Sequence, residues 1–471
     1  YIVPAVMSES TEELITSGSF VVVKKQNYKK LYKVQPNGSL MLGGDLVEMN
    51  EIIGKRFWTT FEMIPVKGKK KRTFSLIEVT KVESWNDLLS TIPSGNDNRS
   101  ITDDGTAQLL SKEEILELQE SGKTGKEIVG SLIENNRTFS DKTEYSQEKY
   151  IKKKEQKYFK YLTICKPTIA SLHDVYFKLD HNKIGTLRMD ALAQILSYSD
   201  VQSEGLYITY NSGNQGLPVA AMLDRIGRNT NGNLINLHPG NMFQTTIIQA
   251  MNFPREQLDR LINVNIYSFL RLHYQGESGV LNTFYASRNT CKNLPEKLKE
   301  SEKINTDTCV DSKDTMDKEI VKDCSLDNPN EVNEKNDVTE ESKNPLKRKV
   351  EDPTEDSTLK KPKWFMETHR AVDLVEKEKA RGLVIVAKEH PLNIITALLP
   401  FLGMSRPFVI FHTHREPLQE TYVALKRKQN VINVRLFSNF LRSYQVLPNR
   451  THPDIVTSDT GGYLLTGYQV E

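Results

Sequence analysis

A long polar tract constrains the fold of this 471-residue chain more than any other feature. Between Gly276 and Pro362, the residues are mostly Glu, Lys, Asn, Asp, Ser and Thr, and large apolar side chains are few. Such a stretch cannot bury enough apolar surface to offset the entropy that ordering would cost. We therefore expect residues 276–362 to form a disordered insert.

The insert interrupts an alternating pattern of strands and helices. Before it, LYITY (206–210) predicts a buried strand, LPVAAMLDRIG a helix and NLINL a second strand. After it, the pattern predicts a helix from Trp364 to about Arg381, strands GLVIVA, RPFVIFH and VINVRLF with helices LNIITALLPFL and EPLQETYVALKRK between them, and a closing hairpin strand GGYLLTGYQV. This alternation is typical of an open α/β sheet. We expect one split α/β domain, formed by residues 168–275 and 363–471.

The N-terminal part reads differently. From Phe20 to about Val82, short alternating stretches are punctuated by Asn37-Gly38 and Gly43-Gly44. This pattern predicts a small antiparallel β-barrel or curled sheet within residues 1–95. A basic cluster, Lys67 to Arg72, lies in its turns. Residues 96–167 are predicted to be a helical connector, in which Ser111 and Glu114 form a capping box ahead of SKEEILELQE, and GKEIVGSLIENN forms the next helix.

The connector ends in a concentrated basic stretch. KYIKKKEQKYFK, from Lys149 to Lys160, holds six lysines and three aromatic residues, although Lys plus Arg (63) and Asp plus Glu (61) nearly balance over the whole chain. A helix here would place Lys149, Lys153, Lys157 and Lys160 on one face and Tyr150, Ile151, Tyr158, Tyr161 and Leu162 on the adjoining one. Because the lysines repel one another, bound phosphates would best explain this face, with the aromatics anchoring the helix or stacking on bases. A merely solvated lysine face is the alternative.

The α/β region contains a glycine turn of the type that cradles nucleoside cofactors. Gly213 and Gly216 remain in Ser212–Gly216, but the G-x-G core is lost. At the end of the second strand, where an acid normally binds the ribose hydroxyls, the chain has His238 and Pro239. KEHP, beginning at Lys388, follows the next strand. These residues predict a nucleotide-binding fold whose cofactor site is degenerate.

Other features narrow the classes of function. His412 and His414 share a predicted strand face, but no acid or Cys cluster completes a metal site. The four cysteines form no CxxC pair, and no apolar run approaches the roughly 18 residues of a membrane span, so we expect a reduced, intracellular protein without a membrane partner. Two basic clusters, at Lys347–Lys349 and Lys360–Lys363, have the layout that importins read, which favours nuclear entry.

Several of these segments together resemble a known family. DNRSITDDGTAQ, GKEIVGSLIENNRTFSDKTEYSQEKYIKKK, GTLRMDALAQIL, RPFVIF and NVINVRLF are similar to the non-catalytic, RNA-binding subunits of the eukaryotic tRNA (adenine(58)-N1)-methyltransferase. The resemblance implies a β-barrel followed by a Rossmann-like methyltransferase fold without a working cofactor site. It also implies a nuclear heterotetramer of two plus two subunits, in which a catalytic paralogue binds S-adenosylmethionine and both kinds of subunit grip the tRNA. No cofactor is expected on this chain.

The resemblance also implies which residues contact tRNA. They are Asn98, Arg99, Asp103, Asp104, Gly105, Gln108, Lys149, Tyr150, Lys152, Lys153, Lys154, Lys157, Tyr158, Lys183, Thr186, Lys388, Lys426, Arg427, Lys428, Asn433, Val434 and Gln445. The lysines and arginines suit phosphates, and Asn98 and Arg99 can also reach 2′-hydroxyls. Asp103 and Asp104 suit a loop-holding role through turn-type backbone bonds, or contacts to base donors.

Three hypotheses follow. The leading one is a catalytically silent subunit that binds tRNA and positions it for its partner. The second is an active S-adenosylmethionine-dependent tRNA methyltransferase with a divergent site, in which Glu389 or Asp224 supplies the missing acid. The third is an assembly scaffold whose lysines are solvated.

Overall fold

The computed structural model describes residues 14–66, 72–79, 94–95, 107–121, 123, 125–277, 362–447, 450–455 and 461–470. The predicted insert between residues 278 and 361, with the basic cluster Lys347–Lys349, lies outside them, as do Lys67 to Lys71. Residues up to Leu270 and from Glu367 onward form one compact unit, and Arg271–Met366 belong to a second. No helix in the described part of the chain is long and apolar enough to cross a bilayer.

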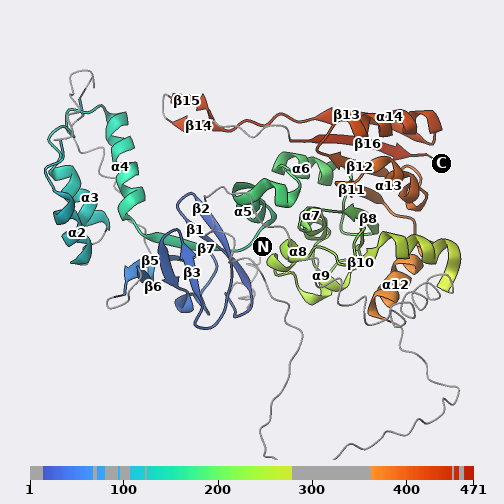
Figure 1. Cartoon of the computed structure of the whole chain (residues 1–471), viewed down its shortest axis with the longest axis horizontal. Helices are drawn as coiled ribbons and strands as arrows, with labels where there is room; N and C mark the ends of the chain where they lie inside the picture. The colour runs from blue at the N-terminus through green and yellow to red at the C-terminus, as the bar shows by residue number, and fades with distance from the viewer. Residues whose placement is uncertain are drawn as a thin grey trace, which may run out of the picture. The chain divides into compact units, whose positions relative to one another are not determined.

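A seven-stranded, barrel-like sheet forms the N-terminal region (Figure 1). Its strands are β1 (Phe20–Lys25), β2 (Tyr28–Lys33), β3 (Ser39–Leu42), β4 (Asp45–Glu48), β5 (Thr60–Pro65), β6 (Thr73–Val79) and β7 (Tyr161–Cys165), with a 3-10 turn η2 (Asn50–Ile52). Their order is β2-β1-β7-β5-β6-β4-β3, and every pair is antiparallel except β4 with β6. Alternating side chains such as Val21, Val23, Phe61 and Ile164 fill its core. The predicted small barrel is confirmed.

The strand β7 corrects one expectation. Tyr161 and Leu162 were predicted to lie on the basic helix, but they pair with Glu62 and Phe61 of β5. The helix ends because Phe159 adopts an extended conformation (φ −79°, ψ 119°). The chain then enters the N-terminal sheet, so this sheet includes residues that were expected in the helical connector.

Three helices precede β7: α2 (Lys112–Glu120), α3 (Gly125–Glu134) and α4 (Glu144–Tyr158). The predicted capping box is confirmed, because the Ser111 hydroxyl accepts a hydrogen bond from the Glu114 N–H at 3.2 Å and the Glu114 carboxylate accepts one from the Ser111 N–H at 2.7 Å. Such a box satisfies two N–H groups that have no partner within a helix. Ile128, Val129, Leu132 and Tyr158 form the core between α3 and α4.

A second seven-stranded sheet has the order β10-β9-β8-β11-β12-β16-β13. The strands are β8 (Leu206–Asn211), β9 (Asn233–His238), β10 (Leu261–Asn265), β11 (Gly382–Val386), β12 (Pro407–His412), β13 (Val431–Ser438) and β16 (Tyr463–Gln469). All neighbours are parallel except β16, which runs antiparallel to both β12 and β13. This is a Rossmann-like, methyltransferase-type sheet, as predicted. The strand order reverses between β8 and β11, and ligand sites of such sheets lie at that switch point.

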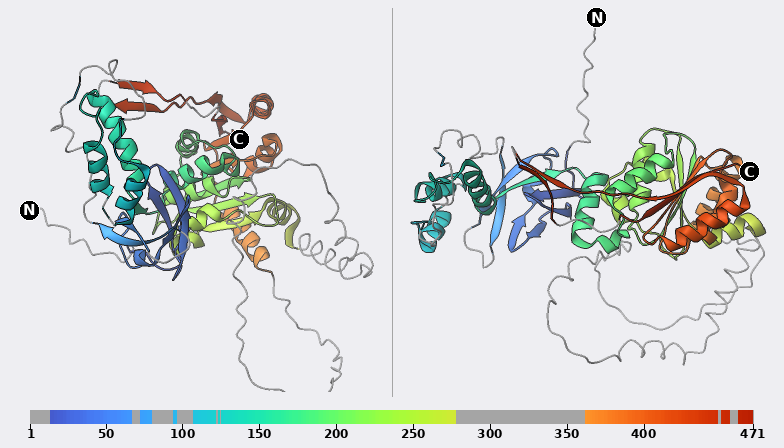
Figure 2. Two further views of the ribbon diagram at one scale, coloured as in Figure 1. Left: turned by 60° about the vertical axis from the view of Figure 1, so that its left-hand side comes forward. Right: turned by 90° about the horizontal axis from the view of Figure 1, so that it is seen from above.

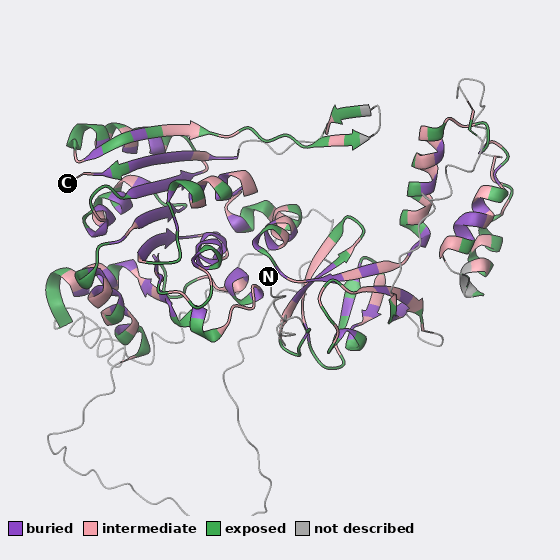
Figure 3. Cartoon of the chain, turned by 180° about the vertical axis from the view of Figure 1, so that it is seen from behind, coloured by how far each residue is buried: buried purple, intermediate pink, exposed green. Residues whose placement is uncertain are grey.

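Helices cover both faces of this sheet (Figure 2). One layer contains α5 (Ile169–Asp180), η3 (His181–Ile184), α6 (Met189–Tyr198), α7 (Leu217–Ile226) and α8 (Thr246–Ala250); the other contains α13 (Pro391–Leu398), η4 (Leu399–Phe401) and α14 (Glu416–Lys428). The remaining described elements are two helices and a hairpin. The helices are α9 (Arg255–Asp259) and α12 (Lys363–Lys377), and the hairpin is formed by β14 (Tyr444–Leu447) and β15 (Arg450–Pro453). The central strands are buried along their length, whereas the hairpin is largely exposed (Figure 3).

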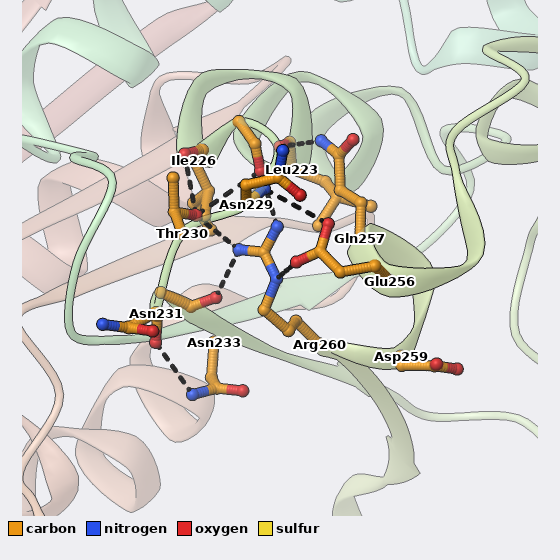
Figure 4. Close-up of polar contacts among 12 residues, drawn as sticks. Leu223, Ile226, Asn229, Thr230, Asn231, Asn233, Glu256, Gln257, Asp259 and Arg260 are labelled. Carbon is orange, nitrogen blue, oxygen red and sulfur yellow. Dashed lines mark hydrogen bonds and ion pairs between the residues drawn. The ribbon is translucent and has the colours of Figure 1, made fainter.

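One buried arginine fixes the loops that lead into β9 and β10 (Figure 4). The Arg260 guanidinium donates to the carbonyls of Gly227 (2.6 Å) and Gly232 (3.0 Å) and to the Thr230 hydroxyl (2.6 Å), and it pairs with Glu256 at 2.8 Å. Gly227 ends α7 with φ +85°, a conformation that favours glycine. Arg260 therefore satisfies buried carbonyls at the end of α7 and in the following loop.

Candidate functional site

The glycine turn lies at the switch point of the Rossmann-like sheet. β8 ends at Asn211, Ser212–Gly216 form the turn, and α7 begins at Leu217. Gly213 and Gly216 have φ values of +72° and +79°, which side chains with a Cβ rarely adopt. The predicted strand, turn, helix and second strand are therefore confirmed, with both remaining glycines at positions that require glycine.

The chain's own side chains fill this turn. A methyl group added to Gly213 would overlap the Cε atom of Lys388, so the Lys388 stem lies against the glycine. The Oε1 atom of Gln244 accepts hydrogen bonds from the N–H groups of Asn214 (2.9 Å) and Gln215 (2.8 Å). N–H groups ahead of a helix are the ones that bind anionic ligand groups in working sites. Here they are already satisfied, and the turn does not fit S-adenosylmethionine.

Two acids were considered as substitutes for the missing cofactor-binding carboxylate: Glu389, which is hydrogen-bonded, and Asp224, which is remote from the turn. Glu389 accepts a hydrogen bond from the Ser212 hydroxyl at 2.5 Å. Burial, and then the nearby Glu389 carboxylate, raise the pKa of Tyr210, so this tyrosine stays neutral. Asp224 lies near the far end of α7, roughly 10 Å along the helix axis from the turn at 1.5 Å per residue. Glu389 is therefore held by the turn itself, and Asp224 lies too far along α7 to reach the turn.

The end of the second strand confirms the missing acid. His238 is the last residue of β9, and its side chain is buried beside Phe243, with 5.8 Å between the ring centroids. Burial lowers the pKa of His238, which keeps the imidazole neutral. A neutral ring cannot replace a carboxylate that accepts hydrogen bonds from two ribose hydroxyls.

Three predicted tRNA contacts gather around the filled turn. A methyl group on Gly185 would overlap the Asn214 side chain, so the loop from Lys183 to Thr186 lies against the turn. Lys183 and Lys388 are both exposed. The former cofactor edge of the sheet therefore presents positive charge from two segments that are about 200 positions apart in the sequence. A positive edge suits a polyanion and disfavours a cationic sulfonium ligand.

The basic helix α4 is amphipathic, as predicted. Ile151 is fully buried and Tyr158 is 6% exposed, whereas Lys149, Lys152, Lys153 and Lys157 are exposed. The ring of Tyr158 packs among Val129, Leu132 and other apolar residues, so it anchors the helix and is not free to stack on a base. Lys160 was predicted to continue the lysine face, but α4 ends at Tyr158 and Lys160 precedes β7.

A pair of lysines contacts the Tyr150 ring. The Nζ atoms of Lys142 and Lys154 each lie 5.1 Å from its centroid, within the range of cation–π attraction. The Tyr150 hydroxyl donates to the Gln108 side chain at 3.2 Å, which joins two predicted tRNA contacts. Burial, followed by Lys157, Lys153 and Lys142, lowers the pKa of Lys154. Lys142 was missed because it precedes α4 and has no place in the helical lysine pattern.

The remaining predicted contacts lie elsewhere. Since α14 runs antiparallel to β12, its exposed last turn, Lys426–Lys428, lies at the amino edge of the sheet, opposite Lys388. Asn433 (φ +53°) lies at a bulge in β13, and the adjacent Val434 is 6% exposed, so the Val434 side chain is not available for contact. Gln445 lies in β14, opposite His452. The predicted tRNA contacts on the Rossmann-like domain therefore do not form one continuous patch.

Some predictions fall outside the described residues, namely those for Asn98, Arg99, Asp103, Asp104 and Gly105. The described ranges contain no group of three or more His, Cys, Asp or Glu side chains that could hold a metal ion. His412 ends β12, so the expectation that His412 and His414 share a strand face was wrong. The His412 ring instead accepts a hydrogen bond from the His414 N–H at 3.0 Å.

The chain was compared with known proteins. Residues 14–320 match the model of the Gcd10p family. A Mus musculus protein named tRNA (adenine(58)-N(1))-methyltransferase non-catalytic subunit TRM6 is 31% identical over 470 residues, covering 98% of this chain and 89% of that protein. A Dictyostelium discoideum protein of the same name is 26% identical, with 98% and 80% covered.

Solved structures give weaker similarities. A SAM-dependent O-methyltransferase from Thermotoga maritima superposes with a TM-score of 0.46 at 10% identity, covering 98% of this chain and 97% of that one. The tRNA (m1A58) methyltransferase TrmI from Aquifex aeolicus superposes with a TM-score of 0.34 at 8% identity, with 97% and 99% covered.

Proposed function

This chain belongs to the Gcd10p family, and from that premise we propose that it binds tRNA and positions it for N1-methylation of adenine 58 by a catalytic partner. It is a non-catalytic subunit of the tRNA (adenine(58)-N1)-methyltransferase, as its curated relatives are named. The observation that carries the proposal is the glycine turn closed by Lys388 and Gln244, next to exposed lysines.

The proposed role is one of orientation. A subunit that supplies no catalytic group can still lower a reaction barrier by holding the substrate in the reactive geometry. The exposed lysines of α4 supply charge for phosphates, and their mutual repulsion is relieved when an anion binds. The edge formed by Lys183, Thr186 and Lys388 would hold a second segment of the tRNA.

The partner and the compartment form part of the same proposal. The catalytic paralogue would bind S-adenosylmethionine, and two subunits of each kind would form a heterotetramer, as the family resemblance implies. The complex would act in the nucleus, in keeping with the basic clusters at Lys347–Lys349 and Lys360–Lys363. The divergent-methyltransferase hypothesis is not retained, because Glu389 is engaged by Ser212 and Asp224 is remote from the turn.

The test uses salt dependence. Binding of labelled tRNA to the full chain, assembled with its catalytic partner, is measured over a range of KCl concentrations for wild type and for K152A/K153A/K154A. Each lost phosphate contact should lower the slope of log affinity against log salt by roughly 0.7 for a single-stranded segment, and somewhat more, toward the roughly 0.9 known for duplex DNA, for a base-paired one. The triple variant should therefore lose roughly 2 to 3 units of slope.

A matched control tests whether position matters. K112A/K178A/K377A removes three exposed lysines from α2, α5 and α12, which are not part of the proposed surface, and should leave the slope near the wild-type value. An unchanged slope in the α4 variant would remove α4 from the RNA interface. If this chain binds its catalytic partner but adds no tRNA affinity at physiological salt, the scaffold hypothesis is favoured instead.

A further inference from the structure

One rim of the N-terminal sheet gathers charged residues from four strand ends. Lys25 is the last residue of β1, and Asp45 is the first residue of β4. Arg72 directly precedes β6 and Lys160 directly precedes β7. Backbone pairing brings these strand ends together. The Leu46 N–H donates to the Arg72 carbonyl at 2.9 Å, and Lys24, the neighbour of Lys25, pairs with Thr163, the third residue of β7.

The rim carries an excess of positive charge. Asp45 pairs with Lys25 at 3.1 Å, and their side chains are 19% and 22% exposed. Arg72 and Lys160 add two cations beside this pair. Burial lowers the pKa of Lys160; Asp45 acts in the opposite direction, and Lys25 and Arg72 lower the pKa further. The rim therefore holds like charges close together, an arrangement that a bound anion would relieve.

The Lys160 side chain is held in place. Its Nζ atom lies 4.3 Å from the centroid of the Phe74 ring, and the backbone carbonyl of Lys160 accepts a hydrogen bond from the Met63 N–H at 2.8 Å. An ammonium group fixed over an aromatic face loses little additional freedom when it binds a phosphate. This distinguishes Lys160 from a freely solvated lysine.

The rim continues from the lysine surface of α4. The helix ends at Tyr158, two residues before Lys160, and Lys157 is exposed on its last turn. The Gln26 side chain, in the turn after β1, donates to the Gln156 carbonyl at 2.7 Å, which ties the rim to the last turn of α4. The two sets of cations are thus joined by a direct contact.

We propose that this rim, formed by Lys25, Arg72 and Lys160, binds the phosphate backbone of the same RNA as a continuation of the α4 surface. The inference rests on the proposed function of the chain and adds the N-terminal sheet to the RNA interface. An acidic protein surface would be the competing occupant. RNA is favoured because the rim adjoins α4, and a chain of evenly spaced phosphates can follow both sets of cations.

The test compares two rims of one sheet. Salt-dependent tRNA binding is measured on the full complex for R72A, for K160Q and for the double variant, with K55A as the control. Lys55 pairs with Glu78 at 2.6 Å at the opposite ends of β5 and β6, so it is a barrel cation remote from the proposed site. R72A and K160Q should each lower the slope by roughly 0.7 to 0.9, and K55A should not change it.

The outcomes separate the two proposals. Since K160Q removes a partly buried contact, thermal unfolding is measured for it, and the exposed R72A variant provides an independent readout. If the α4 triple variant lowers the slope while R72A and K160Q match wild type, the rim proposal is wrong and the proposed function stands. If the rim variants instead lose the catalytic partner and retain the RNA slope, the rim is a protein interface. If neither set changes the slope, both proposals fail.

Discussion

The stem of Lys388 lies against the backbone of Gly213, in the space that the glycine turn leaves open. The glycine that would allow a cofactor to approach instead accommodates a lysine from the end of the neighbouring strand β11. The Gln244 side chain accepts hydrogen bonds from the next two N–H groups, those of Asn214 and Gln215. The backbone of the turn therefore keeps a cofactor-binding geometry, but the space and the donors that a cofactor would use are occupied. The site thus has the fold of a cofactor site, with the Lys388 and Gln244 side chains in the place of a cofactor.

Calorimetric titration of S-adenosylmethionine into the purified chain, without its partner, should give no saturable binding up to millimolar ligand. The reason is that the helix N–H groups are occupied and His238 stands in place of the acid. Micromolar binding would mean that Gln244 and Lys388 move aside readily, and the degenerate-site conclusion would have to be abandoned.

Replacing Lys388 with Met should weaken tRNA binding without destabilising the fold. Methionine keeps an apolar stem to pack on Gly213 and removes only the charge. The expected loss is one phosphate contact, or roughly 0.7 to 0.9 in the salt slope. Lys112→Met, an exposed change on α2, is the control. Equal slopes for the two variants would remove Lys388 from the interface.

Lys154→Gln should separate stability from binding. Burial and three neighbouring lysines disfavour the charged form of Lys154, since its pKa is lowered from 10.5. Removing the charge should therefore leave the melting temperature nearly unchanged, because the relief of repulsions of a few tenths of a kcal/mol each offsets the loss of the cation–π contact with Tyr150, while tRNA affinity falls. Thermal unfolding and tRNA titration check the two effects. A variant that is both less stable and equally tight in binding would contradict the prediction.

Arg260→Ala should destabilise the Rossmann-like domain by roughly 2–4 kcal/mol, because it removes the guanidinium donors to the carbonyls of Gly227 and Gly232 and to the Thr230 hydroxyl (Figure 4). Denaturant unfolding measures the loss. Arg255→Ala, an exposed change on the adjoining helix α9, should stay within about 0.5 kcal/mol of wild type. A similar effect of both changes would show that the hydrogen bonds of Arg260 are not the cause.

Stability should fall as pH drops below about 6.5, partly because of His173. Burial lowers the pKa of His173 below the ordinary value of about 6.5, and its Nε2–H group donates to the Leu187 carbonyl at 2.9 Å. The unfolded state therefore binds the proton first, so the stability present above pH 6.5 is lost as pH falls toward the folded-state pKa. Thermal unfolding between pH 7.5 and 5 should show a shallower pH dependence for His173→Gln than for the exposed control His181→Gln.

Local signals in the sequence predicted much of the fold. The continuous apolar run of β8, the turn chemistry of Ser212–Gly216 and the Ser111–Glu114 capping box each depend on neighbours within a few positions, and each was confirmed. The strand β7 was missed because its pairing partner Phe61 lies 101 positions earlier, whereas the preceding lysines continue a helical pattern. Short-range patterns cannot reveal such long-range pairing.

The sequence alone determined that this chain carries a nucleotide-binding α/β fold with a degenerate cofactor turn and a concentrated lysine face, because glycine spacing, a missing acid and charge clustering can be read along the chain, and the family resemblance added the methyltransferase type. Only the tertiary structure showed which side chains occupy the glycine turn and which basic residues lie together on the N-terminal sheet. Lys388 reaches Gly213 from 175 positions away, and Lys160 meets Lys25 and Arg72 at one rim, because strand pairing brings distant ends together. Local sequence patterns cannot predict such long-range contacts, since the contacts depend on the pairing register of whole sheets.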